Sequence, residues 1–94
     1  MKFEWDPNKA RKNELKHGVS FDEAKSVFDD EYAHEMYDEE HSVSEERFTI
    51  IGMSIKYRVI FVCYCERGDD DIVRIISARK AEKPEIDDYR RFRP

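Results

Sequence analysis

Three apolar segments in the second half of the chain constrain its fold more than any other feature. The segments 47–54, 58–66 and 72–79 are rich in β-branched and aromatic residues, a composition typical of strands. Short polar links at 55–57 and 67–71 join them, and such links favour hairpins between consecutive antiparallel strands. We therefore expect a sheet built around these three segments.

Helix start signals place two helices before these strands and one after them. Asp6 and Pro7 form a good start, because Asp accepts hydrogen bonds from the free amides of a first turn and Pro at the first position loses none. Ser20 and Glu23 have the spacing of a capping box, in which each side chain satisfies a backbone amide of the other residue. The elements expected in chain order are a strand at 3–5, helices at 7–17 and 21–28, a short strand at 32–37, strands at 47–54, 58–66 and 72–79, and a helix from 83 whose inner side carries Ile86, Tyr89 and Phe92.

This order, β-α-α-β-β-β-β-α, predicts an α+β fold in which two N-terminal helices and a C-terminal helix pack on one antiparallel sheet. With 94 residues and neither linker nor repeat, the chain is expected to form a single domain over 1–94. It has no run near the ~20 apolar residues of a membrane helix, and its N-terminus lacks the order of a signal peptide, so we expect a cytoplasmic protein that contacts no membrane. Cys63 and Cys65 stand two apart on one expected strand and face the same way, which favours reduced thiols over a disulfide between them.

Charge is distributed unevenly along the chain, whose formal net charge is −5. Residues 20–46 contain eleven acidic residues and one Lys, whereas basic residues outnumber acidic ones both in 1–19 and in 47–94. The two ends of the chain can therefore form a positive surface although the chain as a whole is acidic. Net charge alone does not exclude RNA or DNA as a substrate.

Motifs of larger enzymes are missing from the sequence, which has no phosphate-binding loop, nucleophile elbow, Cys-x-x-Cys pair or His-Glu-x-x-His. His34 and His41 lie among carboxylates, but their spacing matches no known metal loop, and a solvated or partner-facing acidic segment is the simpler interpretation. The pair Cys63 and Cys65 lacks a second pair to complete four ligands. We expect no metal and no cofactor, so any chemistry must come from scattered side chains.

Polar residues gather on one side of the expected helix at 7–17. At ~100° per residue, Lys9, Asn13, Lys16 and His17 fall within about a third of its circumference. A solvated helix face explains the two Lys residues, and a C-terminal cation interacting with the helix dipole explains His17. The alternative is a surface that binds a phosphate backbone, on which His17 exchanges protons near neutral pH.

Arginine residues mark the ends of the expected strands. Arg47 begins one strand, Arg58 begins the next, and Arg79 is followed by Lys80 at the end of the third. Such cations can hold phosphate, because Arg binds it bidentately and stabilises the charge that develops in phosphoryl transfer. The simpler alternative is ion pairing at strand ends with one of three carboxylates: Glu45, Glu46 or Asp87.

The last of these strands also carries a hydroxyl group near its end. Strand alternation places Ser77 and Arg79 on one face together with Val73 and Ile75, and turns Arg74 to the other face. The hydroxyl, the guanidinium and the ammonium group that follows them would then form an anion site at the end of an apolar strand.

Two functional classes fit these residues. One is a small metal-independent nuclease, in which Arg and Lys hold phosphate and His17 or Glu46 transfers a proton. The other is a non-catalytic interaction domain with a bipolar charge surface. Composition does not choose between them.

The order of several short motifs resembles the BrnT family of ribonuclease toxins, the toxin half of bacterial type II toxin-antitoxin pairs. The resemblance extends from Phe3 to about Tyr89, and its pieces include Phe3-Glu-Trp-Asp-Pro-Asn-Lys-Ala10, Lys16-His-Gly18, Ile51-Gly-Met-Ser54 and Ser77-Ala-Arg-Lys80. It implies a RelE-like fold, RNA cleavage that inhibits translation, and an antitoxin that sequesters the toxin and binds operator DNA through a ribbon-helix-helix type domain.

The same resemblance assigns roles to residues already named. RelE-like nucleases generally lack a metal and use the RNA 2′-hydroxyl as the internal nucleophile, so Glu46 or His17 would remove its proton. Cations would stabilise the phosphorane charge. The expected catalytic residues are His17, Glu46, Arg47, Arg58 and Arg79. The expected substrate-binding residues are Ser77 and Lys80, together with Lys9 and Asn13 from the polar side of the helix at 7–17.

Two features bear on whether this chain is active. Tyr57 stands where a Gly usually precedes Arg58, so the turn could move Arg58. The acidic segment 29–46 suits docking to a basic antitoxin, but it is also compatible with loss of nuclease activity. The alternative function is therefore a catalytically inactive co-repressor that acts only with its antitoxin on operator DNA. We favour the nuclease, because a pure co-repressor has no reason to keep the basic residues.

Overall fold

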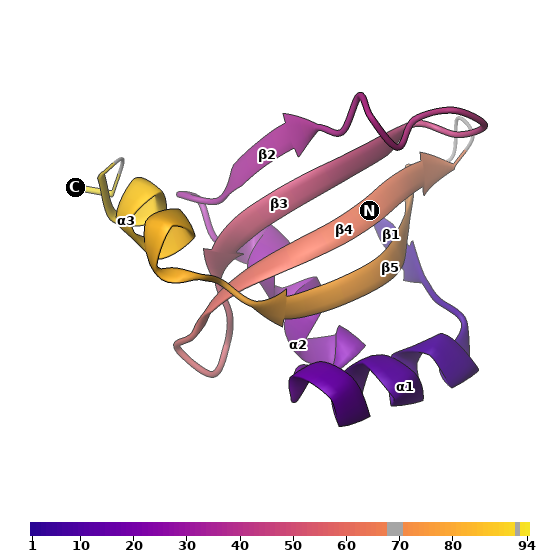
Figure 1. Cartoon of the computed structure of the whole chain (residues 1–94), viewed down its shortest axis with the longest axis horizontal. Helices are drawn as coiled ribbons and strands as arrows, with labels where there is room; N and C mark the ends of the chain where they lie inside the picture. The colour runs from indigo at the N-terminus through magenta and orange to yellow at the C-terminus, as the bar shows by residue number, and fades with distance from the viewer. Residues whose placement is uncertain (68–70, 92) are drawn as a thin grey trace.

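The computed structural model describes residues 1–67, 71–91, 93 and 94, and it contains one five-stranded sheet with helices on both of its faces (Figure 1). The predicted α+β class and the predicted element order are confirmed. In chain order, the elements are β1 (Lys2–Glu4), α1 (Pro7–His17), α2 (Phe21–Ser26), the 3₁₀ helix η1 (Val27–Asp29), β2 (His34–Tyr37), β3 (Arg47–Met53), β4 (Val59–Arg67), β5 (Ile72–Lys80) and α3 (Lys83–Arg91). The placement predicted for Phe92 lies outside the described residues.

The strand order of the sheet is β1-β5-β4-β3-β2. Strands β2 to β5 form the expected antiparallel neighbours, but β1 pairs with β5 in parallel, from Lys2 opposite Ile72 to Glu4 opposite Arg74. The sheet is therefore mixed, and the prediction of a purely antiparallel sheet is corrected for this strand. Apolar alternation has the same period in both directions, so the sequence pattern of a three-residue strand carries no information on its direction.

Local signals explain where the two N-terminal helices begin and end. The Asp6 carboxylate accepts a hydrogen bond from the Asn8 amide at 2.8 Å, and the Ser20 hydroxyl accepts one from the Glu23 amide at 3.0 Å. Gly18 adopts a left-handed conformation with φ of 70°, which a residue without a Cβ atom does at little cost. The second predicted helix is shorter than expected, because the chain tightens into η1 at Val27.

The core lies between one face of the sheet and the helices α1, α2 and η1. Figure 1 shows α2 behind the strands and α1 below β5. Fully buried side chains of β4, namely Ile60, Val62 and Tyr64, meet Ala24 and Val27 there. Each such aliphatic side chain contributes about 1.5–3 kcal/mol when it is removed from water. Gly52 permits the close approach of η1 to β3, because a Cβ atom at this position would lie 2.9 Å from that of Ala33 and 3.0 Å from Val27.

A bulge in β5 decides which side chains reach the other face of the sheet. Cys63 lies opposite Ser77 and Tyr64 lies opposite Ile75, so Ile76 is an extra residue that has no partner in β4. Alternation is reset at this point. Ser77 and Arg79 consequently share the open face with Arg74, and the prediction that they share a face with Val73 and Ile75 is wrong.

Helix α3 lies at one end of the open face, beside the end of β5 (Figure 1). Among the residues that the structure describes, no helix is both long enough and apolar enough to cross a membrane. Both cysteines have free thiols, as expected, and Cys65 is buried.

Candidate functional site

A basic groove of about 250 Å³ runs between α1 and β5. It will be called the α1–β5 groove, and its lining comprises Lys9, Lys12, Asn13, Lys16, His17, Ile76 and Ser77. The four polar helix residues predicted to share a side of the helix all lie along it. Lys12 was not singled out from the sequence, although its position three residues after Lys9 places it on the same side of the helix.

Asn13 attaches α1 to the edge of β5. Its side-chain amide donates to the carbonyls of Ala78 at 2.8 Å and Val19 at 3.0 Å, and its carbonyl oxygen accepts from the Ala78 amide at 3.1 Å. The carboxamide thus pairs with both main-chain groups of Ala78, as a neighbouring strand would, at a point beyond the end of β1. Because Asn13 is only 8% exposed, this geometry gives it a role in positioning the groove.

Arg79 lies on the open face of the sheet, two residues after the groove residue Ser77. Its guanidinium group stacks over the Phe61 ring at 4.3 Å and donates two hydrogen bonds to the carboxylate of Glu85, at 2.8 and 2.9 Å. This pairing raises the pKa of Arg79 and lowers the pKa of Glu85. Ion pairing of the predicted kind is therefore present, but its carboxylate comes from Glu85 and not from Asp87, which pairs with Lys83.

Lys80 follows Arg79 at the end of β5, where it is exposed. Its main-chain carbonyl accepts a hydrogen bond from the Arg79 guanidinium at 3.2 Å. The Arg79 side chain is consequently held by the Phe61 ring, the Glu85 carboxylate and the backbone of its own strand. A phosphate group that approaches Ser77 on the open face thus meets a preorganised guanidinium group. Lys80 lies opposite Ile60 and therefore starts from the other face of the sheet.

Arg58 faces α2 and the end of α1. Its Nε donates to the Glu23 carboxylate at 2.9 Å, a second nitrogen also bonds that carboxylate, and the same nitrogen donates to the carbonyl of Gly18 at 3.0 Å. The carboxylate is 1% exposed and also accepts a hydrogen bond from Ser54 at 2.7 Å. Burial by itself raises the pKa of Glu23, but the bonds from Arg58 and Ser54 outweigh it, so the pKa lies below its usual value.

The β3–β4 turn next to Arg58 accommodates the unusual residue Tyr57. Tyr57 has φ of 59°, the left-handed region that normally favours glycine. Its side chain is 88% exposed. The turn therefore keeps the backbone shape that a glycine would adopt, and Arg58 reaches Glu23 from it.

Glu46 and Arg47 lie at the opposite end of the sheet. Arg47 is opposite Cys65, whereas Arg79 is opposite Phe61, and four residues of β4 span roughly 13 Å at about 3.3 Å each. Glu46 is exposed before β3, and the Arg47 guanidinium pairs with Glu45 at 3.5 Å. The structure therefore brings Lys9, Asn13, His17 and Ser77 together in one groove and places Arg79 two residues beyond Ser77 on the open face. Arg58 binds the carbonyl of Gly18, next to His17, whereas Lys80 lies opposite Ile60 and starts from the other face of β5. Glu46 and Arg47 are apart from these residues.

The acidic segment contains one local ion pair, in which the His41 ring lies 2.9 Å from the Asp38 carboxylate. In residues 1–67, 71–91, 93 and 94, no group of three or more His, Cys, Asp or Glu side chains is arranged to hold a metal ion.

Comparison with known proteins decides the family. Residues 5–85 match the family described as the ribonuclease toxin BrnT of type II toxin-antitoxin systems. The chain belongs to the BrnT family. It is also similar to the crystal structure of the Brucella abortus ribonuclease toxin BrnT, with 25% sequence identity, a TM-score of 0.68, and coverage of 88% of this chain and 99% of that one. Among curated proteins, none matches the chain in sequence.

Membership of the BrnT family confirms the resemblance that the sequence motifs indicated. As the toxin of a type II system, the chain has RNA as its implied substrate and an antitoxin as its implied partner. The expectation of a RelE-like fold is a narrower statement and stays a prediction. The roles of individual residues likewise stay predictions, for which the geometry above supplies the physical argument.

Proposed function

We propose that this BrnT toxin is an endoribonuclease that cleaves RNA without a metal ion, at the α1–β5 groove and the adjacent Arg79. One observation carries the proposal. In a chain with a net charge of −5, three Lys residues and His17 line a single groove, whose β5 side is formed by Ile76 and Ser77. A row of cations along a helix suits a phosphate backbone, whose contacts with Lys supply most of the affinity of sequence-independent binding.

The groove leads the RNA backbone towards Arg79. Ser77 lines the groove and shares the open face with Arg79, two residues further along β5. Three of the five N–H groups of Arg79 are used by Glu85 and the Lys80 carbonyl, which leaves two for a phosphate. Arg79 can therefore bind a phosphate while Glu85 and Phe61 keep its guanidinium plane oriented.

The reaction proposed is an in-line attack within the RNA. The 2′-oxygen bonds to phosphorus, the bond to the 5′-oxygen breaks, and the products are a 2′,3′-cyclic phosphate and a 5′-hydroxyl. His17 accepts the 2′-hydroxyl proton, and water protonates the leaving oxygen. Arg79 stabilises the charge that develops on the phosphorane. The protein thus supplies the positive charge that a metal ion supplies in other nucleases.

The choice of His17 as the base follows from its place in the groove. Glu46 was the other candidate, but it lies at the far end of the sheet together with Arg47. Arg58 acts indirectly in this proposal, because it holds the carbonyl of Gly18 next to His17.

The test is RNA cleavage by antitoxin-free protein in the presence of EDTA. We expect cleavage with cyclic phosphate ends, a loss of about 10²–10⁴-fold in His17→Ala, and a comparable loss in Arg79→Ala. Glu46→Ala is the matched control and should cleave at nearly the rate of the unchanged protein. Cleavage that stops in EDTA, or that survives in both the His17→Ala and the Arg79→Ala variants, would show the proposed chemistry to be wrong.

The alternative function is a catalytically inactive co-repressor. It is favoured by one specific observation, namely that the Arg58 and Arg79 guanidinium groups are each paired with a carboxylate. In this alternative the chain completes a complex on operator DNA, which the antitoxin contacts through a ribbon-helix-helix type domain. RNA that stays intact, also when ribosomes are added, together with tighter operator binding by the complex than by the antitoxin alone, would support it.

A further inference from the structure

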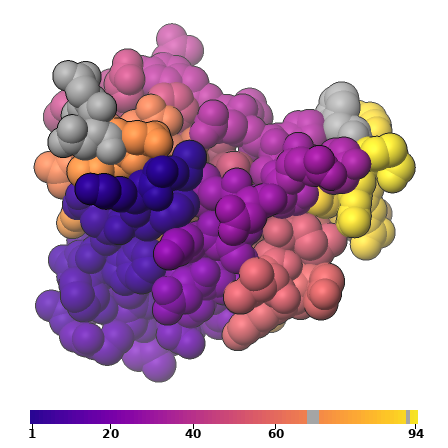
Figure 2. Space-filling view, turned by 180° about the vertical axis from the view of Figure 1, so that it is seen from behind, coloured from indigo at the N-terminus to yellow at the C-terminus, as the bar shows by residue number. Residues whose placement is uncertain are grey.

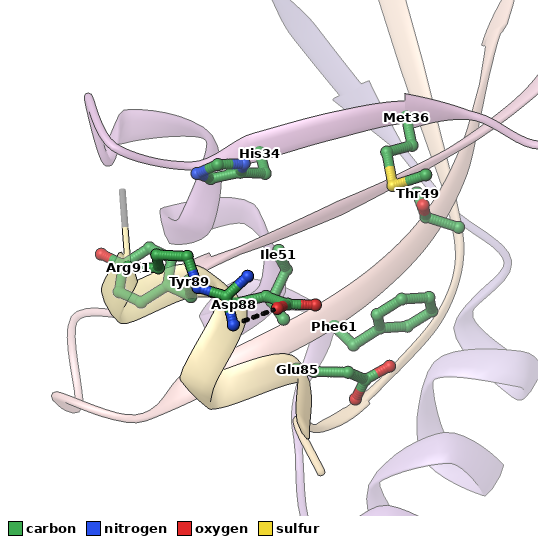
Figure 3. Close-up of a pocket in the computed structure, with 9 residues that line it drawn as sticks. All are labelled: His34, Met36, Thr49, Ile51, Phe61, Glu85, Asp88, Tyr89 and Arg91. Atoms are coloured by element: carbon green, nitrogen blue, oxygen red, sulfur yellow. Dashed lines mark ion pairs between the residues drawn. The ribbon is translucent and has the colours of Figure 1, made fainter. Parts of the chain in front are cut away.

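A largely apolar pocket of about 430 Å³ lies on the open face of the sheet, between the strands and α3 (Figure 3). Figure 3 shows side chains from β2, β3, β4 and α3 around one space, with Met36, Ile51 and Phe61 among them. The same pocket is bordered by Glu85 and Asp88 of α3. It is separate from the α1–β5 groove, with which it shares no lining residue.

We propose that this pocket is the docking site for the antitoxin, which inserts an apolar side chain from a segment that carries basic residues on either side. The inference rests on the antitoxin partner that family membership implies, and it names the surface and the chemistry of the contact. An apolar anchor that fills a pocket, surrounded by polar contacts, is how most interfaces obtain their affinity.

The apolar lining points to an anchor residue. Met36 is 66% exposed on the edge strand β2, so one side of the pocket opens directly to the solvent. Ile51 and Phe61 are only partly buried, although the strands that carry them form the centre of the sheet. Burial of this surface by a partner side chain would be favourable, because apolar surface gains about 25 cal/mol for each Å² removed from water.

The charges around the pocket favour a basic polypeptide over RNA. The carboxylates that line it are Glu85 and Asp88 of α3, with which the cations Arg79 and Arg91 are already paired. The only acidic residue of β2, Glu35, bonds Tyr64 on the other face of the sheet, but the segment 29–46 around β2 contains nine acidic residues and neither Lys nor Arg. These negative surroundings would repel a phosphate backbone and attract Lys and Arg of a partner.

The position of the pocket also explains how docking could stop cleavage. Phe61 and Glu85 line the pocket, and the same two residues hold Arg79 from the ring side and from the carboxylate side. A partner seated in the pocket therefore lies against the residues that orient the proposed phosphate ligand. Docking at this surface would obstruct the open face beside Arg79 without occupying the α1–β5 groove.

The test measures binding of the cognate antitoxin to the full chain by titration calorimetry, without RNA. Thr49→Trp fills the pocket, and we expect it to weaken antitoxin binding by about 30-fold or more. Thr49→Val keeps the size of the side chain and should bind as the unchanged protein does. Met36→Lys is a second pocket variant at an exposed position, which places a charge at the apolar rim without a change in the core.

Two charge-reversal variants test the electrostatic contribution to antitoxin docking. Asp88 lines the pocket and pairs with Arg91, whereas its neighbour Asp87 pairs with Lys83 outside the pocket. Asp88→Lys should slow antitoxin association by about 10-fold at low salt and by less at high salt, and Asp87→Lys should slow it much less.

The outcomes separate this proposal from the proposed nuclease. All of these variants should cleave RNA at the rate of the unchanged protein, and the Thr49→Trp variant should resist inhibition by the antitoxin. Unchanged antitoxin binding by Thr49→Trp and Met36→Lys would overturn the docking proposal, as would loss of RNA binding in place of antitoxin binding. An unchanged protein that fails to cleave RNA would refute the nuclease alone, because the binding measurement requires no activity.

Discussion

Arg58 is the residue for which the structure changes the interpretation most. The sequence suggests a phosphate ligand at the start of a strand, but the side chain neutralises Glu23, which is 1% exposed. When a buried carboxylate loses its cation, no opposite charge offsets the free energy that its removal from water costs, so the fold is destabilised. Loss of toxicity in an Arg58 variant would therefore reflect lost stability before it reflects lost chemistry.

We predict that Arg58→Ala lowers the free energy of unfolding by about 3 kcal/mol, measured by urea denaturation. The double variant Arg58→Met with Glu23→Gln should recover most of this loss, because it removes both charges and keeps the volume of the side chains. Unchanged stability of Arg58→Ala, combined with a loss of RNA cleavage, would return Arg58 to the catalytic residues.

At the scale of elements, α3 is held to the rest of the molecule by a polar contact. The Tyr89 hydroxyl donates to the Asp30 carboxylate, which also accepts from the amides of Met53 at 2.7 Å and Tyr32 at 3.0 Å. Asp30 thus joins the end of η1, β3 and α3. Since α3 carries Glu85 and Asp88, the hydrogen bond of Tyr89 helps to shape both the pocket and the surroundings of Arg79.

We predict that Tyr89→Phe loosens α3 selectively. A hydrogen bond to a charged acceptor contributes about 1.5–3 kcal/mol to the free energy of folding. Without it, amide hydrogen exchange in α3 should become faster, while exchange in β4 stays slow. Tyr37→Phe is the matched control, because it removes a hydroxyl from an exposed tyrosine of β2. Equal exchange in α3 for both variants would contradict the role given to Tyr89.

At the scale of the whole molecule, positive and negative charge gather on two different surfaces. The α1–β5 groove collects Lys side chains from the N-terminal helix, while the acidic segment lies around β2 at the far edge of the sheet. Figure 2, which views the molecule from behind, shows the early part of the chain and the C-terminal segment at opposite sides. This separation of charge is consistent with the two proposals, in which an anionic substrate binds on one side of an acidic toxin and a basic partner binds on another.

Stability should depend on pH through carboxylates whose pKa is lowered on folding, among them three from different parts of the chain. The bonds from Arg79 lower the pKa of Glu85, and the pKa values of Glu23 and Asp30 are lowered because hydrogen bonds outweigh the opposing effect of burial. Each group binds its proton more weakly in the folded chain than in the unfolded chain. Its contribution is therefore present above the ordinary pKa of about 4 and is lost as the pH falls through the lower folded value.

We predict that the free energy of unfolding decreases when the pH falls from 5 to 3, measured by denaturant titration at each pH. The double variant Arg58→Met with Glu23→Gln should show a shallower decrease, since one of the three carboxylates is absent. In the alkaline range, burial and then the Asp30 carboxylate raise the pKa of Tyr89 to about 12, so its contribution is lost as the pH rises from about 10 towards 12. Constant stability between pH 5 and 3 would contradict this account.

Much of the fold could be predicted because its signals are local. The caps at Asp6 and Ser20 set the helix starts, and strand periodicity set β3 and β4 nearly to the residue. The shared side of Lys9, Asn13, Lys16 and His17 also follows from helix geometry alone, and these residues do line one groove. The family could be inferred from sequence for the same reason, because its motifs are short and ordered along the chain.

Other features depended on contacts between residues far apart in the sequence. The parallel direction of β1, the bulge at Ile76 and the pairing of Arg58 with Glu23 are set by register and packing. Strand alternation alone predicts the wrong face of the sheet for Ser77 and Arg79. The reason is that one unpaired residue in β5 moves every later side chain of the strand to the opposite face. The sequence by itself thus determined the elements, the family and the basic side of α1. Only the tertiary structure decided which cations line the groove and which pair with carboxylates, since that choice depends on the nearest opposite charge in space.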